Sequence, residues 1–104
     1  MKPAMVGDDM DLTAIPALAE GAIYRTLDNE AVILNVDDGH YYVLNETATA
    51  IWNLCNGRRS LQDIAALLCG EYDVSPESAR ASVIRLMSDL VQVHLVVLNR
   101  PADA

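Results

Sequence analysis

The side chains that could act as nucleophiles or bind a metal are few and far apart in this sequence. Cys55 and Cys69 are the two cysteines, and His40 and His94 are the two histidines. The cysteines form no CxxC pair, and these four positions match neither a metal-binding spacing nor an activated nucleophile. We therefore predict no catalytic residue, no metal and no cofactor, and we expect both thiols to be small buried side chains.

The backbone of residues 40–44 offers a different kind of chemistry. The run His40-Tyr41-Tyr42-Val43-Leu44 favours a β-strand and contains no proline and no charged residue other than His40. The edge of such a strand can pair its free N–H and C=O groups with an extended peptide. Because side chains alternate along a strand, we expect Tyr41 and Tyr42 on opposite faces, one in the core and one exposed.

A long apolar helix is expected beside this strand, over residues 76–93. Its apolar residues cover about half of the helix circumference, whereas a core-facing helix needs a stripe of only about 100°. The excess could be covered by the strands, by a second copy or by a ligand. The candidate peptide-binding residues are those of the strand and of this helix: His40, Tyr41, Tyr42, Val43, Leu44, Arg80, Val83, Ile84, Met87 and Val91.

Three short β-favouring runs precede the helices, at residues 22–27, 31–36 and 40–44. Asp28-Asn29-Glu30 separates the first two, and Asp37-Asp38-Gly39 separates the last two. Asp-Gly between such runs indicates a tight hairpin in which both central residues have positive φ. We expect an antiparallel three-stranded sheet.

Capping residues mark the starts of three helices. Asn45 can cap the first, which Gly57 stops; Ser60 caps the second, with Asp63 completing a capping box; Ser75 followed by Pro76 begins the third. The predicted order is β-β-β-α-α-α, an α+β fold that resembles a small winged-helix domain. Residues 15–18 and 95–98 could add short packed segments, and Trp52 is expected in the core.

Length and charge limit the class of protein. The chain of 104 residues fits one domain, which we place at residues 15–98, between a flexible arm (1–14) and a tail (99–104). The net charge is −8, and residues 1–56 hold two basic against nine acidic residues, which argues against nucleic acid as the main partner. The sequence contains no apolar run of the roughly 20 residues that a membrane helix needs, and we expect a cytoplasmic protein.

Several short motifs in a fixed order resemble the PqqD family. They are a strand ending in Leu44-Asn45, the pair Ile51-Trp52, the turn Gly57-Arg58-Arg59-Ser60 and a Leu-rich segment from Ile64 to Leu68. The resemblance covers residues 15–98, with His94 at a place where the family often has glycine. It implies a peptide chaperone that binds the leader of a ribosomally made precursor as an added strand. It also implies a modifying enzyme as partner, either a radical S-adenosylmethionine enzyme or a leader peptidase or cyclase.

Two other functions are compatible with the pattern. A winged-helix DNA-binding regulator would use Arg80 and Arg85 on phosphate, although the acidic balance counts against it. A structural subunit would stabilise a modifying enzyme without touching its substrate. Arg58 and Arg59 form either a solvated corner or a docking point for an acidic partner, and the chain could be a monomer or a homodimer.

Overall fold

The computed structural model describes residues 11–28 and 30–100. Its eight elements, in chain order, are β1 (Ile15–Leu18), β2 (Ala22–Leu27), β3 (Glu30–Asn35), β4 (Tyr41–Leu44), α1 (Glu46–Leu54), α2 (Leu61–Glu71), α3 (Pro76–Gln92) and β5 (Val96–Asn99). The predicted α+β order is confirmed, and the strands flanking it, β1 and β5, are additional to the three-stranded sheet.

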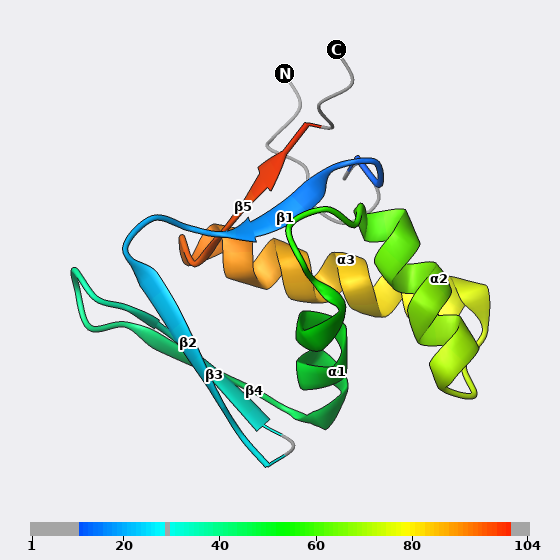
Figure 1. Cartoon of the computed structure of the whole chain (residues 1–104), viewed down its shortest axis with the longest axis horizontal. Helices are drawn as coiled ribbons and strands as arrows, with labels where there is room; N and C mark the ends of the chain where they lie inside the picture. Colours follow the sequence, from blue (N-terminus) through cyan, green and yellow to red (C-terminus); the bar gives the residue numbers. More distant parts are fainter. Residues whose placement is uncertain (1–10, 29, 101–104) are drawn as a thin grey trace.

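Two antiparallel sheets lie on the helical layer (Figure 1). The three-stranded sheet has the order β2-β3-β4, which leaves β4 at an edge. In its register Ile33 lies opposite Tyr42, and Ala31 lies opposite Leu44. The second sheet pairs β1 with β5, so the two ends of the domain meet beside α3.

The predicted caps are present at all three helix starts. The side chain of Asn45 accepts a hydrogen bond from the Ala48 N–H, and that of Ser75 accepts one from the Ser78 N–H. Ser60 and Asp63 form the reciprocal capping box. These bonds satisfy N–H groups that have no partner within their helix, so each boundary is fixed by local sequence. The first helix ends at Leu54, earlier than the expected stop at Gly57.

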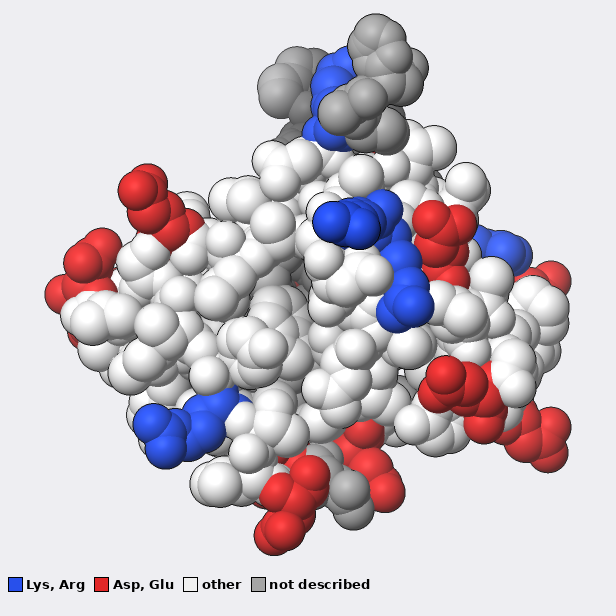
Figure 2. All heavy atoms as spheres, viewed as in Figure 1, with Lys and Arg blue, Asp and Glu red and all other residues white. Residues whose placement is uncertain are grey.

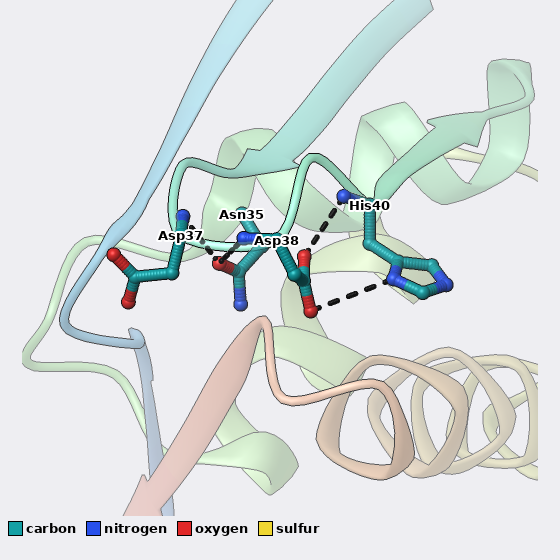
Figure 3. Close-up of polar contacts among 4 residues, drawn as sticks. All are labelled: Asn35, Asp37, Asp38 and His40. Carbon is teal, nitrogen blue, oxygen red and sulfur yellow. Dashed lines mark hydrogen bonds and ion pairs between the residues drawn. The ribbon is translucent and has the colours of Figure 1, made fainter.

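The turn between β3 and β4 differs from the tight Asp-Gly hairpin that we predicted. Asn35 pairs with His40 through its N–H and the His40 carbonyl, so the loop has four residues, and of Asp38 and Gly39 only Gly39 has positive φ. The Asn35 side chain accepts hydrogen bonds from the N–H groups of Asp37 and Asp38 (Figure 3). Such a side-chain cap competes with the two-residue turn and favours the longer loop.

The end of α3 has a specific backbone geometry. The Leu95 N–H donates to the Leu90 carbonyl, and the His94 N–H donates to the Val91 carbonyl. This pair of bonds is a Schellman motif, and it requires a left-handed residue at His94, whose φ is 64°. The motif turns the chain sharply from α3 into β5 and buries Leu95 against the core.

The core lies between the inner face of the three-stranded sheet and the helices. Ile33 and Leu44 from the sheet are buried together with Ile51, Ile64 and the α3 residues that face inward. Trp52 is buried as predicted, and its ring meets that of Tyr24 edge-on with 5.4 Å between centroids.

Residues before β1 also contact the domain. The N–H groups at the start of α2, those of Leu61 and Gln62, donate to the carbonyls of Ala14 and Leu12. Residues 1–14 were expected to form a flexible arm; among them Ala14 is buried and Leu12 packs against the core, and residues 1–10 lie outside the described part of the chain. None of the helices among the described residues is long and apolar enough to cross a membrane.

Candidate functional site

Among the described residues, no strand pairs with the outer edge of β4. Hydrogen-bonded and non-hydrogen-bonded pairs alternate along an antiparallel ladder. Since Asn35 and His40 form a hydrogen-bonded pair, Tyr42 bonds inward to β3, whereas the N–H and C=O groups of Tyr41 and Val43 point away from it. Two consecutive bonding positions are thus available to another strand.

A groove of about 390 Å³ runs between this edge and α3. Its walls come from β4, from the first turns of α1 and from one side of α3. The residues lining it are Tyr42, Val43, Leu44, Asn45, Thr47, Ala48, Ile51, Ser82, Arg85, Leu86 and Asp89. A strand added to β4 would send every second side chain into this groove.

A hydrogen bond between β4 and α3 crosses the inner end of the groove. The Tyr42 hydroxyl donates to the Asp89 carboxylate at 3.1 Å. Desolvation, together with this bond and the charge of Asp89, raises the pKa of the Tyr42 hydroxyl. This hydrogen bond links β4 to α3.

Thr49 fixes the other end of β4. Its buried hydroxyl accepts a hydrogen bond from the Ala31 N–H at 3.0 Å and donates one to the Leu44 carbonyl at 3.2 Å. Ala31 and Leu44 are opposite each other in the register of β3 and β4. The hydroxyl thus joins α1 to both strands and sets where β4 ends and the groove begins.

The strand contains four of the five predicted residues, Tyr41 to Leu44, and these alternate between the two faces as expected. Tyr41 and Val43 are exposed, at 67% and 52%, while Tyr42 is half-buried and Leu44 is fully buried. His40 precedes the strand, and its Nδ1 lies 3.5 Å from the Asp38 carboxylate in the turn (Figure 3). The structure brings Tyr42, Val43 and Leu44 together at the groove.

The predicted residues of α3 do not line this groove. Val83 and Met87 have no exposed surface and belong to the core, which corrects the expectation that they form its wall. At about 100° per residue, Arg80, Ile84 and Val91 lie roughly 160–200° around the helix from Ser82. They border the opposite side of the buried stripe, and Val91 faces a separate hollow next to β5.

Besides Leu86, the groove residues of α3 that sequence reasoning missed are Ser82, Arg85 and Asp89. Their spacing of three and four positions could have indicated a shared surface, because it places all three on one margin of the helix. Apart from Arg80, the residues predicted on α3 were apolar, and two of them, Val83 and Met87, fill the core.

The arginines do not form a phosphate-binding face. Arg80 and Arg85 are about 140° apart around α3, and Arg85 lies in the groove beside Asp89. Arg59 donates to the Leu54 carbonyl at 2.9 Å and so completes the end of α1, which is a structural role. Figure 2 shows basic and acidic atoms dispersed over this side of the molecule, with no basic stripe.

The thiols are also structural. Burial raises the pKa of Cys55 to about 12, and its sulfur donates to the Ile51 carbonyl. Cys69 donates to the Val74 carbonyl, and both cysteines are free. Within residues 11–28 and 30–100 there is no group of three or more potential metal ligands.

Sequence comparison adds to this geometry. The family model described as coenzyme PQQ synthesis protein D (PqqD) matches residues 30–96. The chain belongs to the PqqD family. The match begins at β3 and ends in β5, so it contains β4, α3 and the whole groove between them. No curated protein sequence matches the chain significantly.

Solved structures share the fold. The PqqD part of Methylobacterium extorquens PqqCD, described as a functional stand-alone recognition element for ribosomally synthesised and post-translationally modified peptides, is 26% identical with a TM-score of 0.67; the alignment covers 90% of this chain and 95% of that one. Lasso peptide synthetase B1 complexed with its leader peptide is 26% identical, with a TM-score of 0.71 and coverage of 79% and 96%. TbiB1 in complex with the TbiA(beta) leader peptide is 23% identical, with a TM-score of 0.70 and coverage of 83% and 98%.

Proposed function

We propose that this PqqD-family protein is a non-catalytic peptide chaperone, which binds the leader of a ribosomally synthesised precursor by strand addition at β4. It presents that precursor to a modifying enzyme. The observation that carries the proposal is an unpaired strand edge directly beside a groove, in a chain similar to two leader-peptide complexes.

The expected mode is an antiparallel fourth strand. All strand pairs in the described part of the chain are antiparallel, and antiparallel pairing is slightly more stable per residue. The backbone groups of Tyr41 and Val43 would bond to the peptide. Alternate peptide side chains would enter the groove between Tyr42 and the Ser82–Asp89 margin of α3. Backbone bonds would supply affinity, and the groove would supply selectivity.

Val43→Pro tests this mode sharply. Proline removes the outward N–H of Val43 but no bond to β3, and edge positions whose N–H faces solvent tolerate proline. We expect leader binding to weaken about tenfold or more, since the peptide carbonyl loses its donor in a partly desolvated site. Val43→Ala is the matched control, because it removes the same exposed side chain and keeps the N–H.

The measurement is titration of the labelled protein with precursor leaders encoded near its gene, followed by amide resonances. Shifts confined to residues 41–45 and 82–89, abolished in Val43→Pro and kept in Val43→Ala, would support the proposal. If every leader leaves these resonances unchanged, strand addition at β4 is wrong.

The modifying enzyme in this proposal is a radical S-adenosylmethionine enzyme or a leader peptidase or cyclase. A pull-down with such an enzyme, with and without leader, separates a chaperone from a structural subunit. A chaperone captures both partners, and Val43→Pro captures the enzyme alone. Capture of the enzyme with no leader binding by the unsubstituted protein would favour the structural subunit instead.

A further inference from the structure

The groove beside β4 continues past the end of the strand. A second cleft of about 410 Å³ lies between α1, the end of α2 and the start of α3, and it shares Thr47 and Ser82 with the first. Ser78, Ser82, Arg85 and Asp89 follow one margin of α3 through both hollows. At about 1.5 Å per residue this margin is roughly 16 Å long, enough for about five residues of extended peptide.

The lining of the second cleft differs from that of the first in charge. Two acidic residues line it, Asp28 from the β2–β3 turn and Glu46 from the first turn of α1. In the part of the chain that the structure describes, no Lys, Arg or His lines it. Figure 2 shows acidic atoms gathered at the lower end of the molecule, where Figure 1 places this turn and the start of α1.

An aromatic and aliphatic wall completes the cleft. Tyr72 and Val74 line it and are 48% and 39% exposed, although both are large apolar side chains. A tyrosine ring near carboxylates attracts an ammonium or guanidinium group both by its face and by the neighbouring negative charge. The apolar stem of a Lys or Arg side chain can pack on such a wall while its charged end reaches the carboxylates.

We propose that this second cleft binds a Lys or Arg side chain of the precursor peptide, in the segment that precedes the added strand. The inference rests on the proposed function, because the cleft is continuous with the β4 groove. Direction follows from the register: β4 runs from Tyr41 to Leu44, so an antiparallel peptide has its earlier residues at the Leu44 end, next to Thr47 and the second cleft. The site thus binds a basic residue that precedes the added peptide strand, as well as that strand itself.

A displayed library tests the proposal without a known precursor. Random 14-residue peptides are selected on the intact protein and on the double variant Asp28→Asn, Glu46→Gln. Asparagine is suited to position 28, where φ is 55° and few other residues are tolerated. We expect peptides selected on the unsubstituted protein to carry Lys or Arg three to five residues before an apolar strand segment, and those selected on the double variant to lose this preference.

Two control variants each remove one carboxylate that does not line the cleft. Glu77→Gln takes a carboxylate from the first turn of α3, as Glu46→Gln does from α1, and Asp37→Asn changes the other hairpin turn; neither residue lines the cleft. Both should keep the basic preference. For one selected peptide, replacing its basic residue with Gln should weaken binding about three- to tenfold at 50 mM salt and much less at 500 mM, since salt screens exposed charges.

The outcomes separate the two proposals. Selected peptides that depend on the Val43 N–H but show no basic preference would overturn the second cleft and leave strand addition intact. The same basic preference on the double variant would also overturn it. If no peptide that depends on the Val43 N–H is selected, the proposed function itself fails.

Discussion

At the residue scale, His94 stands where the backbone favours glycine. Its φ of 64° is imposed by the Schellman motif that joins α3 to β5. A residue with a Cβ in this conformation costs roughly 1–2 kcal/mol relative to the right-handed region, and glycine avoids that cost. The family often has glycine at this position, and the positive φ of His94 explains why glycine fits there.

Replacing His94 with glycine should stabilise the fold. We expect His94→Gly to raise the free energy of unfolding by about 0.5–1 kcal/mol, because relief of strain exceeds the entropy that glycine adds to the unfolded chain. Urea denaturation measures it. His94→Ala is the control and should give no gain, since alanine keeps the Cβ; equal stability of the glycine and alanine variants would contradict the strain.

The Cys55 thiol should be unreactive in the folded protein. The pKa of Cys55, raised to about 12 by burial, leaves almost no thiolate at pH 8, and thiolate is the reactive form. Iodoacetamide at pH 8 should therefore leave Cys55 unmodified in the folded protein. Peptide mass spectrometry follows the label, with urea-unfolded protein as the positive control; rapid labelling of Cys55 in the fold would show that it is more accessible than in this structure.

At the element scale, the position of β4 depends on one hydroxyl. Thr49 bonds both Ala31 and Leu44, and valine has nearly the same shape without that hydroxyl. Thr49→Val should destabilise the protein by about 2 kcal/mol, because a buried N–H and a buried C=O lose their partner. Faster hydrogen exchange at the Ala31 amide is the specific readout. Thr47→Val, on the same helix, is the control, and equal losses in the two variants would show that Thr49 has no special role.

The turn before β4 should respond to acid. The His40 N–H donates to the Asp38 carboxylate at 2.8 Å, and this bond holds the pKa of Asp38 below its model-peptide value of about 3.8 (Figure 3). Because the pKa is lowered in the folded state, the ionised carboxylate stabilises the turn at pH values above the pKa of the unfolded chain. This stabilisation is lost as the pH falls through the pKa of the folded protein. The His40 amide resonance should therefore move at a pH below about 3.8, and Asp38→Asn should abolish the movement. A midpoint at or above the ordinary value would argue against the bond.

At the scale of the whole molecule, the β1–β5 sheet is part of the same core as the β2-β3-β4 sheet. Leu95 and Val96 are almost fully buried, at 1% and 2%, and belong to one cluster with Trp52. Residues of both sheets belong to this one core cluster, so the two sheets should unfold as one unit.

Leu95→Ala tests this unity. We expect a loss of about 2–5 kcal/mol from the removed side chain and the remaining cavity. The unfolding transitions followed by Trp52 fluorescence and by far-UV circular dichroism should both move to the same lower urea concentration. If dichroism changes first and fluorescence later, the β1–β5 sheet unfolds separately. Val97→Ala is the control, because Val97 is 44% exposed and should cost little.

Features that depend on near neighbours in the chain were predictable from local sequence. The capping side chains of Asn45, Ser60 and Ser75 accept hydrogen bonds from N–H groups three positions away. The uncharged strand at residues 41–44 is equally evident from its residue types. The order of elements, the likeness to the PqqD family and the open edge at β4 follow from such local signals and from motif spacing.

Which side of α3 faces that edge depends on long-range packing. A helix turns until its apolar residues fill the core, and here Val83 and Met87 do so. That rotation brings Ser82, Arg85 and Asp89 to the groove, although their polarity alone indicated a solvated side. The second cleft was equally hidden, because Asp28, Glu46 and Tyr72 come from three elements far apart in the chain. Long-range packing, which no short window of sequence contains, places them around one hollow.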